Sequence, residues 1–394
     1  MASFSFPNLW QKLKKTLWLA FIFGLLSCLL IGFLTSAIAN ANSTQIRGVW
    51  LTSNDQVRFS DQGRTQAAID QLAQLNFNTL YPVIWNSGYI MYESAVAQRE
   101  GIQPFVPRGD QGQDFIGDII AKAHQRRLMV MPWFEFGFMT PTYSELAANH
   151  PSWLTQRQDG TRTFNNAAGE VVWLNPFRPE VQNFITDLVL EIVNRYDLDG
   201  IQFDDHTALP NEFGYDPYTV ALYQEETGEM PPSDPKEPAW VRWRADKITA
   251  FMAQLTQKIK AVKPNLIISL SPATYNLAYN TYLQDWLGWI REGIVDEVIV
   301  QLYRSSLSSF VEPINRAEIE EAQGQIPTAV GILTGLKTKP VSISLIADKV
   351  RVAQSEGVGI SFFYYKTLWD VAPEDKSNRI QAFRQFFPRP AFRR

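Results

Sequence analysis

Cysteine and histidine are scarce in this chain: one cysteine, Cys28, and three histidines occur among 394 residues. Cys28 lies in the first 39 residues, so a protein cleaved after Ala39 has no thiol. Disulfides, thiolate nucleophiles and zinc–thiolate sites are then excluded. The sequence also lacks a G-x-G-x-x-G motif, a P-loop and a G-x-S-x-G elbow, which disfavours a nucleotide-binding sheet and a serine hydrolase.

Basic charge is also in short supply. The chain has 36 Lys and Arg against 40 Asp and Glu, a net charge of −4, and loss of three lysines with residues 1–39 makes it −7. We find no basic cluster and expect no nucleic-acid partner. Aromatic side chains are plentiful, with 12 Trp, 14 Tyr and 25 Phe. Most belong in a core, but aromatic faces in a cleft suit stacking on sugar rings.

The first 39 residues have the pattern of an export signal. Three lysines precede an apolar run from Leu17 to Phe33, and an Ala-x-Ala site ends at Ala39. An uncleaved anchor is the alternative, since about 20 apolar residues can span a bilayer. Residues 1–39 are therefore a predicted signal peptide or membrane anchor, with residues 17–39 as the anchoring part. We expect an exported protein, periplasmic or associated with the cell envelope.

Short β-type runs alternate with amphipathic helical stretches through the rest of the chain. The predicted strands are Gly48–Thr52, Thr79–Trp85, Leu128–Glu135, Gly200–Asp205, Leu266–Ser271, Glu297–Tyr303, Ala329–Leu333 and Gly359–Tyr364. The predicted helices lie near 65–75, 114–126, 179–196, 241–262, 283–292, 312–323, 342–355 and 374–386. This alternation predicts an α/β fold, a (β/α)8 TIM barrel at residues 40–386, followed by a loose tail at 387–394.

The connections after predicted strands two, three and four are long. They span 86–113, 136–177 and 206–239, whereas most connections leading back into strands are short. In a (β/α)8 barrel the connections after strands form the catalytic face. Loops of this size are usually binding elements or lids, so we expect a substrate groove on that face.

The segment Asp199–His206 reads Asp-Gly-Ile-Gln-Phe-Asp-Asp-His. Its apolar residues alternate with Gly200, Gln202 and Asp204, as in a strand with one face in an apolar layer and the other toward the barrel interior. Asp204 then stands at the carboxyl end of strand four, where barrel enzymes mount catalytic groups. Asp205 points the other way, as a second catalytic carboxylate or as a support that caps the loop or orients His206.

Glycoside hydrolysis typically needs two carboxyl groups on opposite sides of the scissile bond. We predict Asp204 as the nucleophile or charge stabiliser because of its place on strand four. We predict Glu135 as the general acid/base, because Phe134 and Phe136 flank it and would desolvate its carboxyl group and raise its pKa. A salt bridge from Glu135 to an arginine or to Lys366 is the alternative.

Other polar and aromatic residues at predicted strand ends should face the same mouth. We expect Trp85, Trp133, Trp173 and Tyr303 to stack on or orient sugars. The full predicted substrate-binding set is Asn54, Trp85, Asn86, Trp133, Trp173, His206, Gln301, Tyr303 and Lys366.

Asp204, Asp205 and His206 also have the side chains of metal ligands. Adjacent residues on a strand diverge, however, so a site would need partners from other strands, and His124 lies in a predicted helix. We expect no metal and no other cofactor. A metal-dependent polysaccharide deacetylase or esterase remains one alternative function, and a non-catalytic glycan-binding barrel is another.

Four ordered motifs resemble the glycosyl-hydrolase-like 10 family of exported bacterial proteins. They are Arg47–Thr52, Trp173–Pro176, Tyr196–Asp205 and Gln301–Arg304, and the similarity extends from Arg47 to about Lys366. The resemblance implies a TIM-barrel glycosidase fold and export to the envelope. One branch of that family is linked to cutting peptidoglycan glycan strands.

The resemblance also implies kinship with proteins whose strand-four aspartate is the nucleophile in a Gly-aromatic-Arg-x-Asp pattern. Here Gln202 stands in place of the arginine, and Ser271–Thr274 stands where those relatives have a glutamate. The acid/base must therefore come from elsewhere, so Glu135 is inferred from position. We predict an exported glycoside hydrolase acting on an extended glycan, such as peptidoglycan strands or another envelope polysaccharide. The sequence indicates no oligomeric state.

Overall fold

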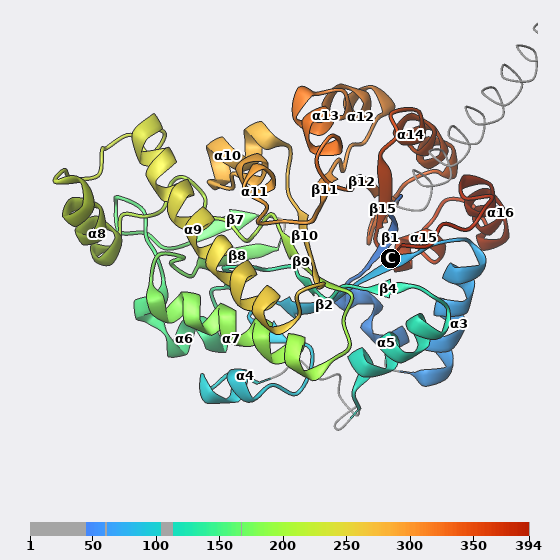
Figure 1. Ribbon diagram of the computed structural model, residues 1–394, viewed down its shortest axis with the longest axis horizontal. Coiled ribbons are helices and arrows are strands. Elements are labelled where there is room, and N and C mark those ends of the chain that lie inside the picture. The colour runs from blue at the N-terminus through green and yellow to red at the C-terminus, as the bar shows by residue number, and fades with distance from the viewer. Residues whose placement is uncertain (1–44, 60, 104–112, 167, 394) are drawn as a thin grey trace, which may run out of the picture.

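A closed barrel of parallel strands forms the centre of the protein (Figure 1). The computed structural model describes residues 45–59, 61–103, 113–166 and 168–393. Strand β1 pairs with both β2 and β15, which closes the sheet, so the predicted (β/α)8 barrel is confirmed. Its strands are β1 (Arg47–Leu51), β2 (Thr79–Asn86), β4 (Met129–Val130) with β5 (Trp133–Phe134), β9 (Gly200–Asp204), β10 (Ile267–Ser271), β11 (Glu297–Gln301), β12 (Thr328–Leu333) and β15 (Gly359–Phe363).

Helices surround the barrel (Figure 1). They are α3 (Gln62–Gln74), α5 (Phe115–Gln125), α7 (Pro179–Arg195), α9 (Pro238–Val262), α11 (Trp286–Arg291), α12 (Leu307–Ile314), α13 (Ala317–Gln323), α14 (Ile343–Ser355) and α16 (Lys376–Phe386). The predicted helix at 312–323 is thus divided between α12 and α13, and Pro313 lies at the end of α12. Within the described part of the chain, no helix combines the length and apolar character needed to cross a membrane.

The connections after the strands contain further elements. The one after β2 holds β3 (Tyr89–Ile90) and α4 (Ala95–Arg99), and the one after β9 holds α8 (Pro217–Thr227). The connection after β5 forms a small antiparallel sheet in the order β6 (Met139–Pro141), β8 (Gly169–Trp173), β7 (Phe164–Asn166). The remaining elements are η1 (Ser53–Asp55), α2 (Gln56–Phe59), α6 (Glu145–Asn149), η2 (Pro151–Trp153), α10 (Tyr275–Tyr282), β13 (Gly335–Leu336), β14 (Lys339–Pro340) and α15 (Tyr365–Trp369).

Strand alternation divides the core into two layers. Ile201 and Phe203 of β9 face the large apolar layer beneath the helices. Gln202 faces the barrel interior, where it accepts a hydrogen bond from Trp50 Nε1 (2.6 Å) and donates one to Ser269 Oγ (3.0 Å). The parity predicted for β9 therefore holds, and Asp204 follows Gln202 on the interior side.

The third barrel strand is interrupted between β4 and β5. Pro132 lies in the gap and has no N–H to donate, so the strand is not a continuous run from 128 to 135 as predicted. The Pro132 carbonyl still accepts the N–H of Gln202 (2.9 Å), which keeps β9 aligned beside this strand.

The C-terminal residues close the amino-terminal end of the barrel, which corrects the prediction of a loose tail at 387–394. Phe387 is 1% exposed and packs edge-to-face on Phe77. The Arg393 side chain enters the barrel, pairs with buried Glu297 and donates to Thr79 Oγ1 (2.8 Å). Arg394 lies outside the described residues.

Glu297 is the centre of a polar cluster at this end of the barrel. Its carboxylate also accepts hydrogen bonds from the Tyr81 hydroxyl (3.0 Å) and from Ser269 Oγ (2.6 Å). Every polar partner of this buried acid therefore comes from a different segment of the chain. A buried charge of this kind is tolerated when it is paired and its remaining oxygen lone pairs are satisfied.

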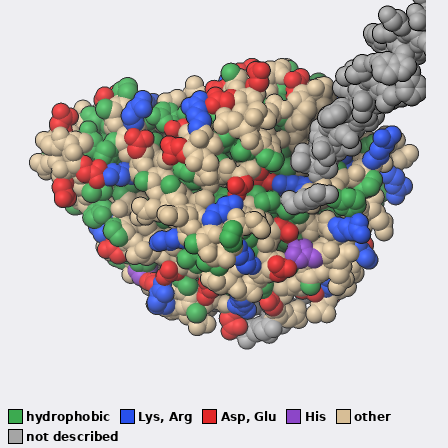
Figure 2. All heavy atoms as spheres, viewed as in Figure 1, with side chains coloured by type: hydrophobic (Ala, Val, Ile, Leu, Met, Phe, Trp, Pro, Cys, Tyr) green, Lys and Arg blue, Asp and Glu red, His purple; other side chains and the backbone are tan. Residues whose placement is uncertain are grey.

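Surface charges of both signs are interspersed on the face shown in Figure 2. Exposed ion pairs join them locally, for example Arg291 with Glu321 (2.7 Å) and Arg316 with Glu312 (2.7 Å). The predicted signal or anchor at residues 1–39 lies outside the described residues.

Candidate active site

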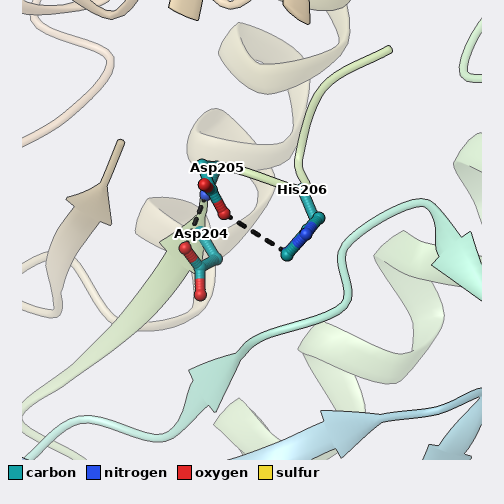
Figure 3. A group of neighbouring side chains, drawn as sticks. All are labelled: Asp204, Asp205 and His206. Atoms are coloured by element: carbon teal, nitrogen blue, oxygen red, sulfur yellow. Dashed lines mark hydrogen bonds and ion pairs between the residues drawn. The ribbon is translucent and has the colours of Figure 1, made fainter. Parts of the chain in front are cut away.

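Asp204 stands at the carboxyl end of β9 (Figure 3), and its side chain has hydrogen-bond partners on two segments of the chain. Its Oδ1 accepts the main-chain N–H of Asp205 (2.7 Å) and the side-chain amide of Gln301 (2.5 Å), which ends β11. Gln301 also donates to the Ser271 carbonyl (2.9 Å), and Gln284 donates to the Asp204 carbonyl (3.0 Å). Both the backbone and the carboxylate of Asp204 are therefore fixed before any ligand binds.

The environment of Asp204 opposes its ionisation. Burial raises the pKa of Asp204 well above the ordinary value of a carboxyl group, and the nearby charges of Asp205 and Glu135 raise it further. The N–H group of Asp205 acts in the opposite direction, because a hydrogen bond to the carboxylate favours its charged form. Three carboxyl groups thus form one electrostatically coupled group at the mouth.

Glu135 directly follows β5 at the same end of the barrel. Its carboxylate accepts a hydrogen bond from the side chain of Asn86, the last residue of β2. Desolvation raises the pKa of Glu135 to about 7; the Asn86 hydrogen bond lowers it, and the charge of Asp205 raises it. No salt bridge joins Glu135 to an arginine or to Lys366 within the described residues, so its carboxyl group is suited to proton transfer near neutral pH.

Asp205 and His206 lie beside Asp204 (Figure 3). His206 Nδ1 is 2.9 Å from the Glu135 carbonyl oxygen and 3.3 Å from Asp205 Oδ1. The imidazole ring packs near Phe136 and Trp173, at centroid distances of 6.0 and 6.3 Å. Asp205 therefore lies beside the imidazole, and both roles expected for it stay predictions.

Asp204, Asp205 and His206 offer ligand atoms that all lie within 4.8 Å of one another. A carbonyl oxygen only accepts hydrogen bonds, so the Nδ1 that faces the Glu135 carbonyl carries a proton. Nε2 is then the ring nitrogen left to bind an ion. Asp204 Oδ1 likewise already accepts two N–H groups. Fewer atoms are therefore free to bind an ion than the three side chains contain. The expectation of no catalytic metal stays a prediction.

The structure corrects the roles expected for Trp85 and Trp173. Trp85 is fully buried, donates to the Gly137 carbonyl (2.9 Å) and packs edge-to-face on Phe184 of α7. A register shift between Val83 and Trp85 reverses the side-chain alternation at the end of β2, which turns Trp85 away from the barrel axis. The same shift leaves Asn86 free to reach Glu135.

Trp173 is 1% exposed, and its indole N–H donates to the Ala208 carbonyl (2.9 Å). It therefore joins the connection after β5 to the connection after β9. Neither Trp85 nor Trp173 presents a face that a sugar ring could stack on.

Trp133 and Tyr303 lie at the interior end of the site. Trp133 is 2% exposed, packs against Trp50 (6.3 Å between centroids), and its buried indole N–H has no partner among the described residues. Tyr303 stacks on Phe363 (4.8 Å) and is partly exposed. Burial raises the pKa of Tyr303, and the charges of Asp204, Asp205 and Glu135 add to this effect. Both rings pack against Phe363, at centroid distances of 6.3 Å for Trp133 and 4.8 Å for Tyr303. Trp133 is too deeply buried to stack on a sugar ring, which corrects the role expected for it.

The family model described as glycosyl hydrolase-like 10 matches residues 45–353, which run from just before β1 into α14. The chain belongs to this family.

Two bacterial relatives share part of the sequence. "Glycosyl hydrolase DigH" of Escherichia coli strain K12 is 24% identical over 309 residues, which cover 68% of this chain and 67% of DigH. "Glycosyl hydrolase YngK" of Bacillus subtilis strain 168 is 25% identical over 302 residues. That match covers 68% of this chain but only 56% of YngK.

Solved structures confirm the fold of this glycosyl hydrolase-like 10 protein. The glycoside hydrolase domain of PgaB (BpsB) from Bordetella bronchiseptica has a TM-score of 0.61 at 14% identity, covering 87% of this chain and 98% of that domain. Alpha-L-fucosidase isoenzyme 2 from Paenibacillus thiaminolyticus has a TM-score of 0.60 at 15% identity, covering 87% of this chain and 49% of the fucosidase. Both are similar in fold to this barrel.

Two predicted binding residues of the glycosyl hydrolase-like 10 chain lie on the loops after β1 and β15. Asn54 and the side chain of Lys366 are exposed, and no described contact brings either of them to the carboxyl groups. The Lys366 main-chain N–H donates instead to Asp55 (2.8 Å), a buried acid that also accepts from Thr52. Burial raises the pKa of Asp55 to about 7. This contact joins the first and last loops of the barrel.

Gln284 is the site residue that sequence reasoning missed. It lies between α10 and α11 and donates to the carbonyls of Asp204 (3.0 Å) and Thr207 (3.1 Å). No pattern marks it, because it is not at a strand end. Its contacts depend on how the connection after β10 folds back over β9.

Proposed function

We propose that the protein is an exported glycoside hydrolase that cleaves glycosidic bonds in an extended glycan, with peptidoglycan strands or another envelope polysaccharide as substrate. The observation that carries this proposal is the pair of Asp204 and Glu135. Asp204 ends β9, Glu135 follows the neighbouring strand β5, and the two are electrostatically coupled. Gln301 holds Asp204 and Asn86 holds Glu135, each through its side-chain amide.

The two carboxyl groups have different roles in the proposed reaction. Glu135, with its pKa raised to about 7, stays protonated up to neutral pH and gives its proton to the leaving glycosidic oxygen. Asp204 in its ionised form attacks the anomeric carbon as the bond to the leaving oxygen breaks, or stabilises the positive charge that develops there. Water then adds to the anomeric carbon and gives its proton to the Glu135 carboxylate, which restores both groups. Protonation of Glu135 removes one of the negative charges that oppose ionisation of Asp204. The acid form of one group therefore favours the base form of the other.

Several features support an extended, extracytoplasmic substrate. The long connections after β2, β5 and β9 rise on the same end of the barrel as the carboxyl groups, where elongated grooves form. The N-terminal sequence has the pattern of an export signal, and the curated relatives DigH and YngK are named as glycosyl hydrolases.

We expect Glu135→Gln to lower kcat/KM for glycan cleavage by about 100-fold at pH 6, because the amide cannot donate the required proton. In the wild type, kcat/KM should fall as pH rises through about 7, since the pKa of Glu135 lies there and its protonated form is the active one. The variant should lose this alkaline limb. The measurement is a pH–rate profile on residues 42–394 with peptidoglycan strands and neutral polysaccharides, and mass analysis of the products.

Glu145→Gln is the matched control. Glu145 lies on α6 in the same long connection, where it accepts the Gln103 N–H (2.9 Å), and its replacement should leave the profile unchanged. If the pH–rate profile of Glu135→Gln keeps its alkaline limb, Glu135 is not the general acid. Wild-type protein that binds a glycan without altering its mass would favour a non-catalytic glycan-binding barrel.

The cluster of Asp204, Asp205 and His206 favours a second candidate, a metal-dependent polysaccharide deacetylase or esterase. For the hydrolase proposed above, we expect the cleavage rate to stay unchanged after exhaustive treatment with a chelator, because both catalytic groups are carboxyls. The rate should be followed by release of reducing ends, with acetate release measured in parallel. Loss of activity on chelation, restored by a divalent cation and accompanied by acetate release, would establish the second candidate instead.

A further inference from the structure

The segment that carries Glu135 crosses the segment that carries Asp204 in direct contact. The Phe138 N–H donates to the His206 carbonyl (3.0 Å), and His206 Nδ1 faces the Glu135 carbonyl (2.9 Å). Gly137 lies between them with φ +48°, and a Cβ at this position would be 2.3 Å from the His206 carbonyl oxygen. Only glycine fits so close an approach, because a larger side chain at this position would push the two segments apart.

The His206 ring is fixed within this crossing. Its Nδ1–H points at the Glu135 carbonyl, and Asp205 Oδ1 lies 3.3 Å from the same nitrogen. Phe136, from the same segment as Glu135, and Trp173, from β8, pack close to the ring. The imidazole therefore bridges the residue that bears one carboxyl group and the loop that bears the other.

We propose that His206 is a positioning residue whose Nδ1–H sets the separation of the Glu135 and Asp204 carboxyl groups by holding their two segments together. This inference rests on the proposed hydrolysis and replaces the substrate-binding role expected from the sequence. The bond acts on the main chain of Glu135 itself, and His206 is two residues from Asp204. A misplacement of about 1 Å between reacting groups costs about 100-fold in rate.

Three substitutions separate this role from others. The amide nitrogen of asparagine lies close to the place of imidazole Nδ1, whereas that of glutamine lies close to the place of Nε2. We expect His206→Ala to lower kcat about 100-fold with KM changed less than about threefold. His206→Asn should recover about tenfold of that loss, and His206→Gln should recover none.

Each other pattern overturns the proposal. Recovery by glutamine but not by asparagine would show that Nε2 contacts the substrate or an ion. An equal loss of kcat in all three variants, at unchanged melting temperature, would show that the imidazole itself transfers a proton. A loss of kcat in proportion to the fraction of unfolded protein would show that His206 has a purely structural role.

His150→Ala is the matched control. His150 belongs to the same long connection, stacks on Trp153 (3.8 Å) and has its Nε2 3.2 Å from the Glu100 carbonyl, but it has no described contact with either carboxyl group. Its replacement should leave kcat unchanged.

A measurement without substrate keeps this inference separate from the proposed function. In the wild type, carbon-13 NMR of the Glu135 carboxyl should give a pKa of about 7, with Asp205 and Asp204 as the charged groups that face it. His206→Ala should lower that pKa as water enters the crossing, and His206→Asn should restore it. An unchanged pKa in His206→Ala would overturn the positioning role even if the wild type cleaves glycan. Absence of glycan cleavage with the expected pKa changes would instead overturn the proposed function alone.

Discussion

Replacement of Asp204 by asparagine is expected to lower kcat by about 10³-fold or more, because the amide can neither attack nor stabilise the positively charged anomeric centre. The oxygen of the new side-chain amide can still accept the hydrogen bonds of the Asp205 N–H and the Gln301 amide, so the local geometry should persist. Glycan binding should therefore stay close to that of the wild type. The measurements are kcat on the cleaved glycan and the equilibrium affinity for it.

The stability of Asp204→Asn should equal or exceed that of the wild type at pH 7. Burial and two neighbouring acids raise the pKa of Asp204 in the folded protein, so the folded state binds this proton more tightly than the unfolded state. Such a group destabilises the fold above its unfolded pKa, and the neutral amide removes that cost. Thermal melting at pH 7 tests this, and a wild-type kcat in the variant would disprove the role of Asp204.

Asp216→Asn is the contrasting control. Asp216 is also buried, but it caps α8 and accepts hydrogen bonds from Thr155, Asn175 and Thr219. Its replacement should lower the melting temperature, because the buried partners lose their charged acceptor. The kcat of the folded fraction should not change. We therefore expect Asp204→Asn to lower kcat without loss of stability, and Asp216→Asn to lower stability without loss of kcat.

Replacement of Glu297 by alanine is expected to lower the free energy of unfolding by about 3–5 kcal/mol. The change leaves the Arg393 guanidinium buried without its counter-charge and removes the acceptor of the Tyr81 and Ser269 hydroxyl groups. Urea denaturation followed by circular dichroism measures the loss. The remaining folded protein should keep its kcat, since Glu297 begins β11 whereas Gln301, which holds Asp204, ends it.

The double variant Glu297→Leu with Arg393→Met should recover much of that stability, because it removes the unpaired charge as well as the pair. Glu321→Ala is the surface control: it breaks an exposed pair with Arg291 and should leave the urea midpoint nearly unchanged. If Glu297→Ala lowers the free energy of unfolding as little as Glu321→Ala does, the pair of Glu297 and Arg393 does not stabilise the amino-terminal end of the barrel.

The barrel could be predicted because hydrophobic periodicity is a local signal. The alternation of Gly200, Ile201, Gln202 and Phe203 identified β9 and the side on which Asp204 lies. The corrections concern features that depend on distant partners. The tail sequence around Arg393 contains two prolines and three arginines, a pattern of loose chain, and its buried partner lies in β11.

The details of the site were harder to predict than its location. Strand alternation placed Gln202 toward the barrel interior, and Gln301 was expected at the mouth because it ends a strand. The contact of Gln301 with Asp204 depends on the register between strands, which the sequence does not reveal. Trp85 was misplaced for a related reason, since the register shift in β2 reverses its direction and no single-strand pattern reveals it.

The pairing that closes the barrel has a consequence for folding kinetics. Strand β1 aligns Arg47 with Ile360 of β15, so the sheet closes through contacts between opposite ends of the described chain. Contacts of such large sequence separation form slowly, because the loop-closure entropy is lost before the pairing compensates for it. Until β15 docks, β1 and β12 each present an unpaired strand edge, the kind of surface on which neighbouring chains aggregate. Dilute, slow refolding should therefore give a higher yield of native barrel than refolding at high concentration.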